Sequence, residues 1–114
     1  QDWVLRGFRQ FDAPVCVIIT YDRVLADSDD TAFDCGAVTT ALVNAAWSRG
    51  LGAVINSQGI MQSPVVREHA RIAEDQVIMK AVALGWPDHS FPANAVVSER
   101  KTLEEAVTFL GFQD

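Results

Sequence analysis

A polar turn, Asn56-Ser57-Gln58-Gly59, holds the residues of this sequence whose types and spacing could do chemistry. The turn follows a short apolar run at residues 51–55, so we expect its amides and side chains at the end of a strand. Amide and hydroxyl side chains, together with backbone N–H groups, can receive a flat, polar cofactor through hydrogen bonds. The same residue types also favour an ordinary connecting turn, which is the alternative interpretation.

Arg100 is a second candidate binding residue, because the planar fork of a guanidinium group suits a phosphate. A solvated surface arginine explains it equally well. His69 and His89 have no second ligand at the spacing of a metal site. Cys16 and Cys35 are interpreted as small packing residues, although a disulfide between them stays open. We therefore predict neither a metal site nor a catalytic side chain.

Composition limits the classes of function. The 114 residues suffice for one domain with one core, so residues 1–114 are expected to form a single domain. The net charge of −6 and the scattered Lys and Arg residues argue against a nucleic-acid binder. No apolar stretch approaches the roughly 18 residues that cross a bilayer, and no signal peptide is recognised, so the expected location is the cytoplasm.

The expected elements alternate between strands and helices. Residues 15–21, 51–55 and 77–84 are predicted to be strands, the first of them buried on both faces because it is rich in β-branched residues. Residues 1–13 carry apolar side chains at roughly helical spacing and need a surface to pack against. Further helices are expected to start near Asp34, at Ser63 as N-cap with Pro64 in the first turn, and at a capping box, Thr102-Leu103-Glu104-Glu105. The helix after this capping box is expected to contain Leu103, Val107 and Leu110, and the acidic stretch from Asp22 to Asp30 is interpreted as a solvated loop.

The helix expected after Asp34 is the best patterned element. Asp34 is predicted to be its N-cap, and Gly50 to end it. The buried face is predicted to consist of Val38, Ala41, Leu42, Ala45 and Ala46. These elements indicate an α+β fold with a small sheet flanked by helices. Because three strands leave sheet edges open, we expect the fold to complete itself by oligomerisation.

Several segments together resemble the C-terminal half of a nitroreductase-family flavoprotein. Their order and spacing over residues 11–112 carry the resemblance more than any single segment does. The segments are Phe11-Asp12-Ala13-Pro14-Val15, Asp34-Cys35-Gly36-Ala37, Gly50-Leu51-Gly52, Asn56-Ser57-Gln58-Gly59, Glu74-Asp75, Ala83-Leu84-Gly85-Trp86-Pro87 and Ser98-Glu99-Arg100-Lys101.

The resemblance implies an α+β fold that binds FMN at a homodimer interface. It also implies electron transfer from NADH or NADPH, through the flavin, to nitroaromatic or quinone-like acceptors. Gln58 and Gly59 match the turn whose backbone faces the flavin ring near N5, and Asn56 and Ser57 match the residues before it. Arg100 matches a basic residue that pairs with the FMN phosphate.

One departure from the family supports a different interpretation. The Arg-x-Ser-x-Arg type motif that holds FMN in the N-terminal half of family members is absent from this sequence. The chain is therefore expected to correspond to a half-domain. The alternative function is a truncated, non-catalytic half-domain that acts as an oligomeric small-ligand-binding or interaction protein.

Overall fold

A three-stranded antiparallel sheet is the centre of the fold. The computed structural model describes residues 2–111. The strands are β1 (Val15–Asp22), β2 (Gly52–Asn56) and β3 (Gln76–Gly85), in the order β1-β3-β2, so that β3 pairs with both neighbours. The three predicted strands and the α+β class are thus confirmed.

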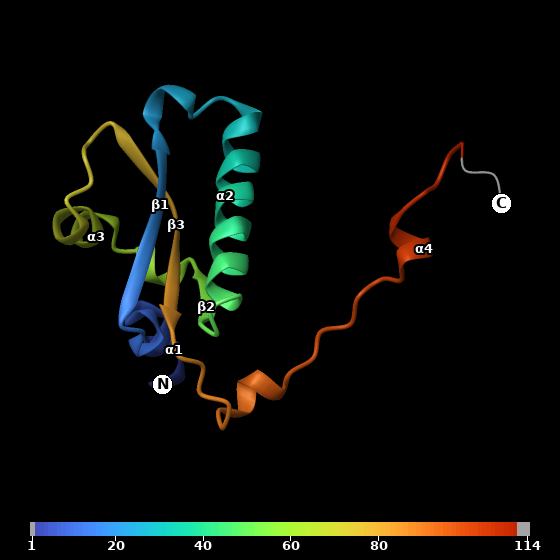
Figure 1. Cartoon of the computed structure of the whole chain (residues 1–114). Helices are drawn as coiled ribbons and strands as arrows, with labels where there is room; N and C mark the ends of the chain where they lie inside the picture. The colour runs from blue at the N-terminus through green and yellow to red at the C-terminus, as the bar shows by residue number, and fades with distance from the viewer. Residues whose placement is uncertain (1, 112–114) are drawn as a thin grey trace.

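Helices lie on both sides of this sheet. The long helix α2 (Asp29–Trp47) runs along one side, while α1 (Asp2–Phe8) and α3 (Ser63–Ala70) lie on the other (Figure 1). The remaining helix is α4 (Leu103–Ala106), and the short 3-10 turns are η1 (Gln10–Asp12), η2 (Arg23–Leu25), η3 (Gln58–Ile60) and η4 (Pro92–Ala95). No helix in this part of the chain is long and apolar enough to cross a membrane.

The core lies between the sheet and α2. Ile19 of β1 and Val82 and Leu84 of β3 pack with Cys35 and Ala46 of α2, and all five are buried. Val82 has no exposed surface, because β3 is covered by a strand on each side and by α2 above. The removal of this apolar surface from water is what holds α2 against the sheet.

Strand β1 is not buried on both faces, contrary to the prediction. It forms an edge of the sheet, and Ile19 is its only buried residue. Cys16 is exposed rather than packed in the core, although partial burial still raises the pKa of its thiol. Cys35 is buried as predicted, and both cysteines are free. A β-branched run is therefore compatible with an edge position, since residue type alone does not report how many strands are neighbours.

Helix α2 begins earlier than predicted. Its N-cap is Ser28 and its first residues are Asp29 and Asp30, so Asp34 lies inside the helix and is not a cap. Two carboxylates in the first turn are favourable, because the helix dipole places positive charge there. The acidic stretch interpreted as a loop thus contains both the 3-10 turn η2 and the start of α2.

The buried face of α2 also differs from the predicted one. Its buried residues are Thr31, Cys35, Thr39 and Ala46, whereas Val38 is 59% exposed and Ala41 and Ala45 lie on the exposed side. The hydroxyl of Thr39 donates to the carbonyl of Cys35 at 2.6 Å, which satisfies it inside the helix. The helix is apolar on two faces, so the pattern could not tell which face meets this sheet.

The chain from Pro92 to Gly111 leaves the body of the molecule, and every residue of this segment is exposed (Figure 1). The radius of gyration is 17.5 Å, compared with about 13 Å for a compact domain of this length. The capping box at Thr102 is confirmed, but the helix that it opens has only four residues and excludes Val107 and Leu110. At the start of α3 the N-cap is Gln62, so Ser63 is the first helical residue instead of the cap.

Gly50 ends the turn after α2 as predicted, with a φ of +76° that L side chains rarely adopt. We expect Gly50→Ala to lower the free energy of unfolding by about 1 kcal/mol, because alanine is strained in this conformation. Gly36 is a matched control, since it lies inside α2 with open space around it. Gly36→Ala should raise stability by about 0.5–1 kcal/mol through helix propensity. Urea unfolding of both variants gives the two values, and shifts of the same sign would contradict this account.

Candidate functional site

The turn after β2 is shaped by the side chain of Asn56. This residue is 4% exposed, and its carbonyl oxygen accepts a hydrogen bond from the backbone N–H of Gln58 at 2.9 Å. Its amide nitrogen donates to the backbone carbonyl of Gly7 at 2.6 Å and to Oε1 of Gln10 at 3.1 Å. Asn56 therefore ties the turn to the N-terminal segment, and its own polar atoms point into the protein.

Gln10 completes this connection from the opposite side. Its Nε2 donates to the carbonyl oxygen of Gly59 at 3.0 Å. The contact is close enough that a Cβ atom on Gly59 would overlap the Gln10 side-chain amide, and one on Gly7 would overlap the side chain of Gln58. Glycine at both positions is thus required by the approach of two chain segments. We call Gly7, Gln10, Asn56, Gln58 and Gly59 the interlock.

The backbone of the N-terminal segment is strained where it meets the turn. Gln10, Phe11 and Asp12 all have left-handed φ angles, between 55° and 58°. Such a conformation costs about 1–2 kcal/mol per non-glycine residue. The hydrogen bonds of Gln10 and a double hydrogen bond from Arg9 to Asp12 accompany it. The Arg9–Asp12 pair is largely exposed, so the partly buried hydrogen bonds of Gln10 make the larger contribution.

The outer side of the turn is rich in hydrogen-bond donors. Gln58 N–H is engaged by Asn56, but the backbone N–H groups of Ser57 and Gly59 donate to no acceptor within residues 2–111. The Ser57 hydroxyl is exposed and accepts a hydrogen bond from Nζ of Lys80, on β3, at 2.5 Å. Donors of this kind can bind the electron-rich edge of a planar heterocycle.

Arg100 does not join this turn within the chain. It belongs to the exposed C-terminal segment that leaves the sheet, and its Nη1 donates to the carbonyl of Glu99 at 3.0 Å. The predicted site residues are therefore divided between two places. Asn56, Ser57, Gln58 and Gly59 lie together at the end of β2, whereas Arg100 lies in the segment that points away (Figure 1).

Sequence reasoning missed Gln10 and Lys80 in this region. Gln10 had no local signal, because its partners are 46 and 49 residues away along the chain. Lys80 did carry a local signal, because it is the single charged residue within the apolar run 77–84. A half-buried lysine in a central strand is unusual enough to indicate a specific role.

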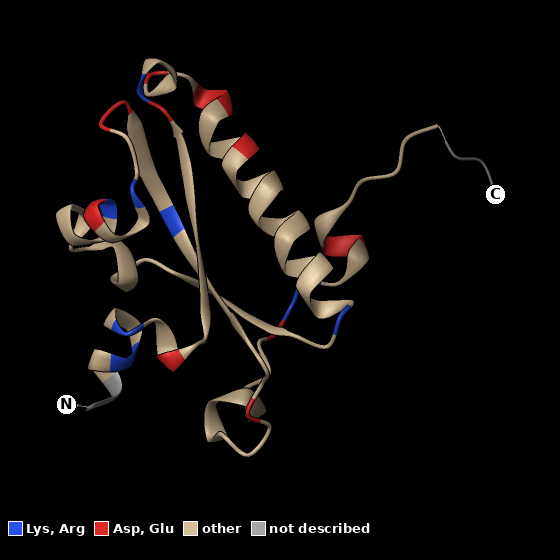
Figure 2. Ribbon diagram, turned by 60° about the vertical axis from the view of Figure 1, so that its left-hand side comes forward, with Lys and Arg blue, Asp and Glu red and all other residues tan. Residues whose placement is uncertain are grey.

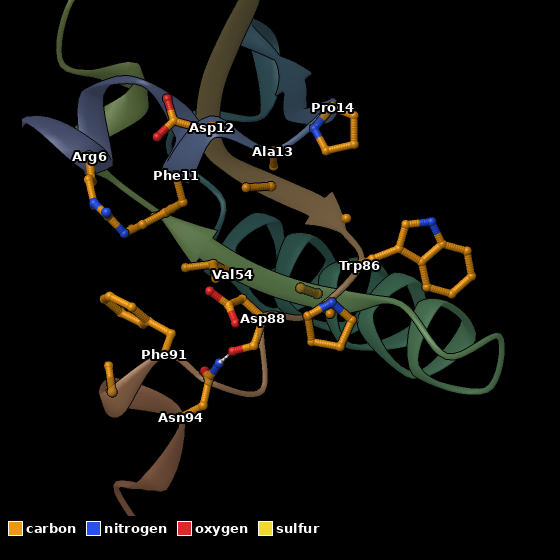
Figure 3. A pocket seen from close by; sticks show the side chains of 16 residues that line it. Arg6, Phe11, Asp12, Ala13, Pro14, Val54, Trp86, Asp88, Phe91 and Asn94 are labelled. Atoms are coloured by element: carbon orange, nitrogen blue, oxygen red, sulfur yellow. Dashed lines mark hydrogen bonds between the residues drawn. The ribbon is translucent and has the colours of Figure 1, made fainter.

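A cavity of about 420 Å³ lies on the same side of the sheet as the interlock. Figure 3 shows Phe11, Phe91 and Val54 around it, with the ring of Trp86 turned away from them. The guanidinium of Arg6 lies over the Phe91 ring, with its Cζ atom 5.1 Å from the ring centroid. Hydrogen bonds from the Ser90 side chain and backbone lower the pKa of Asp88 at its rim. No cluster of three or more possible metal ligands occurs among the described residues.

Comparison with known proteins identifies relatives over most of the chain. The sequence model of the nitroreductase family matches residues 1–86. The chain is 37% identical over 107 residues to the nitrobenzene nitroreductase of Ectopseudomonas oleovorans, and 36% identical over 108 residues to the chloronitrobenzene nitroreductase of Comamonas testosteroni. These alignments cover 94% and 95% of this chain but 46% and 47% of the relatives, so the chain spans about half their length.

Solved structures agree on the fold. The FMN and NADPH-dependent nitroreductase NfnB from Sphigopyxis sp. strain HMH superposes with a TM-score of 0.83 at 22% identity. The superposition covers 97% of this chain and 49% of that one. The small sheet and its helices therefore correspond to part of a nitroreductase fold.

The interlock can be tested with a double-mutant cycle. Gly59→Ala should lower the free energy of unfolding by about 1–2 kcal/mol, because Gln10 must leave and lose its two hydrogen bonds. In a Gln10→Ala background the same substitution should cost much less, since the φ of Gly59 is not left-handed and the three atoms nearest to its Cβ position all belong to the removed Gln10 amide. Urea unfolding measures all four proteins. Additive effects would show that Gln10 and Gly59 are not coupled.

Proposed function

Because this chain belongs to the nitroreductase family, we propose that it is the flavin-binding part of an FMN-dependent oxidoreductase. The relatives' names support reduction of nitroaromatic compounds, and NADH or NADPH is the proposed electron donor. The observation that carries the proposal is the turn at Ser57 and Gly59, where two backbone N–H groups and an exposed hydroxyl have no acceptor within the described residues.

The residues present fit a flavin at one side of this turn. The side of Gly59 that faces Gln10 is filled, so a flavin ring has to approach the side that carries the unpaired N–H groups. Ser57 and Gly59 would hold the ring through their unpaired backbone N–H groups and the Ser57 hydroxyl, between which Gln58 is fixed by its own bond to Asn56 and its contact with Gly7. Asn56 would contribute by fixing the shape of the turn, because its own polar atoms are already bonded.

The chemistry of the proposed enzyme comes from its cofactor. Bound FMN supplies two-electron transfer between a nicotinamide and the acceptor. The chain's own residues orient the ring and set its electrostatic surroundings. No acid–base side chain is needed for this role.

We propose that Arg100 binds the FMN phosphate only in an assembly. Its segment is exposed throughout, and the guanidinium has further donors beyond the one used on Glu99. In a homodimer the segment of one protomer could lie against the other protomer, which would bring Arg100 to a flavin at the shared interface. A flavin that contacts both protomers would account for the separation of Arg100 from the turn at residues 56–59 within one chain.

The outer face of α2 supports such a homodimer. A shallow apolar groove follows this face, and Phe33 and Trp47 nearby are 76% and 71% exposed. Figure 2 shows that the acidic positions of α2 lie in its N-terminal half, so the rest of the face is uncharged. The groove is lined by Ala32, Phe33, Gly36, Ala37, Thr40, Ala41 and Asn44.

Flavin binding is the direct test of the proposed function. After FMN is added and the excess removed, the purified chain should keep a flavin absorption band with shifted fine structure. The band should bleach when NADPH or NADH is added without oxygen, and return when nitrobenzene is supplied. A colourless protein would contradict the proposal and favour a non-catalytic half-domain that binds other small ligands or partners.

The homodimer is tested separately by light scattering coupled to size exclusion. We expect the wild-type chain to be a dimer, and Ala37→Glu to weaken association at least tenfold, because the carboxylate would lose its water in the groove. Glutamate is a good helix former, so α2 should remain intact. Val24→Glu is the control, since Val24 is 83% exposed and lies outside α2. A monomeric wild-type chain, or equal effects of both substitutions, would exclude this interface.

A further inference from the structure

Lys80 is a cation placed in the middle of the sheet. It lies on the central strand β3, half-buried, within the otherwise uncharged run from Val77 to Leu84. Among the three strands it is the only Lys or Arg. The strand covers part of the lysine side chain, while the hydrogen bond of its ammonium group is exposed.

The neighbours of Lys80 do not neutralise it. Its Nζ donates to the Ser57 hydroxyl oxygen at 2.5 Å, and it forms no ion pair with a carboxylate of the described residues. An ammonium group has three donors, so two remain for another acceptor. The pairing follows from the sheet, because Asn56 is opposite Ala81 and the next residues in each direction are Ser57 and Lys80.

The donors around Ser57 therefore form one group with a positive charge. They are Nζ of Lys80, the Ser57 hydroxyl, and the unpaired N–H groups of Ser57 and Gly59. Such a group favours a ligand that carries negative charge or gains it. A flavin gains electron density when it is reduced, and nearby charge is one means by which a protein tunes that step.

We propose that Lys80 is a positioning residue that fixes Ser57 and makes the turn bind reduced FMN more tightly than oxidised FMN. This inference rests on the proposed flavin site. It adds a residue that the predicted set of Asn56, Ser57, Gln58, Gly59 and Arg100 does not contain. The consequence is a more positive reduction potential for the bound flavin, so that it accepts electrons from a nicotinamide more readily.

The test is the reduction potential of FMN bound to the full chain, measured in wild type and in Lys80→Met. Loss of the charge should weaken binding of reduced FMN about tenfold relative to oxidised FMN, the order expected for one charged hydrogen-bond donor. A tenfold change corresponds to about 30 mV for a two-electron couple, so the potential should fall by that amount. Lys80→Arg should restore most of it, because the cation is kept.

Two controls separate this role from a structural one. Arg23→Met removes a cation from the exposed turn η2, outside the proposed site, and should leave the potential unchanged. Circular dichroism should show that Lys80→Met folds normally, since methionine fits an apolar strand. Ser57→Ala should lower the potential in the same direction, because Lys80 loses the acceptor that positions it.

The possible outcomes are distinct. If the wild-type chain binds no FMN, both the proposed function and this inference fail. If it binds FMN but the potential of Lys80→Met equals that of wild type, the inference fails and the flavin site stands. A lowered potential in Lys80→Met, restored by Lys80→Arg and absent from Arg23→Met, supports the inference.

Discussion

The side chain of Asn56 is the interaction on which the arrangement of the candidate site depends. It is the last residue of β2, and its three hydrogen bonds join the strand end, the following turn and the N-terminal segment. A buried amide with all of these partners satisfied specifies one geometry, because any displacement leaves a polar group unpaired inside the protein. The turn is consequently fixed before any ligand arrives. The N–H groups of Ser57 and Gly59 have no acceptor within the described residues and stay available to a ligand.

The hydrogen bonds around the turn are accompanied by backbone strain in the N-terminal segment. Three successive residues, Gln10, Phe11 and Asp12, adopt left-handed backbone angles, at a cost of about 1–2 kcal/mol each. The partly buried hydrogen bonds that Gln10 makes with Gly59 and Asn56 offset part of this strain. The two segments therefore stabilise each other through these contacts.

Local patterns in the sequence predicted the elements but not their neighbours. The three strands, the glycine at residue 50 and the capping box at Thr102 follow from residue types within a few positions, and all were found. The buried face of α2, the edge position of β1 and the contact between Gln10 and Gly59 depend on segments distant in the chain. Periodicity could not choose between two apolar faces of α2, and a glycine in a polar turn does not reveal which side chain approaches it.

Two exposed surfaces of the chain differ in chemistry, and the difference indicates what each can receive. The outer face of α2 is uncharged beyond its first turns and lined by small side chains, so a complementary surface has to be apolar and closely shaped. The turn at Ser57 is rich in donors and carries the charge of Lys80, so its complement has to supply acceptors. A second copy of an acidic chain with an apolar helix suits the first surface. A planar, acceptor-rich ring suits the second, and the flavin site and homodimer interface that we propose would account for both.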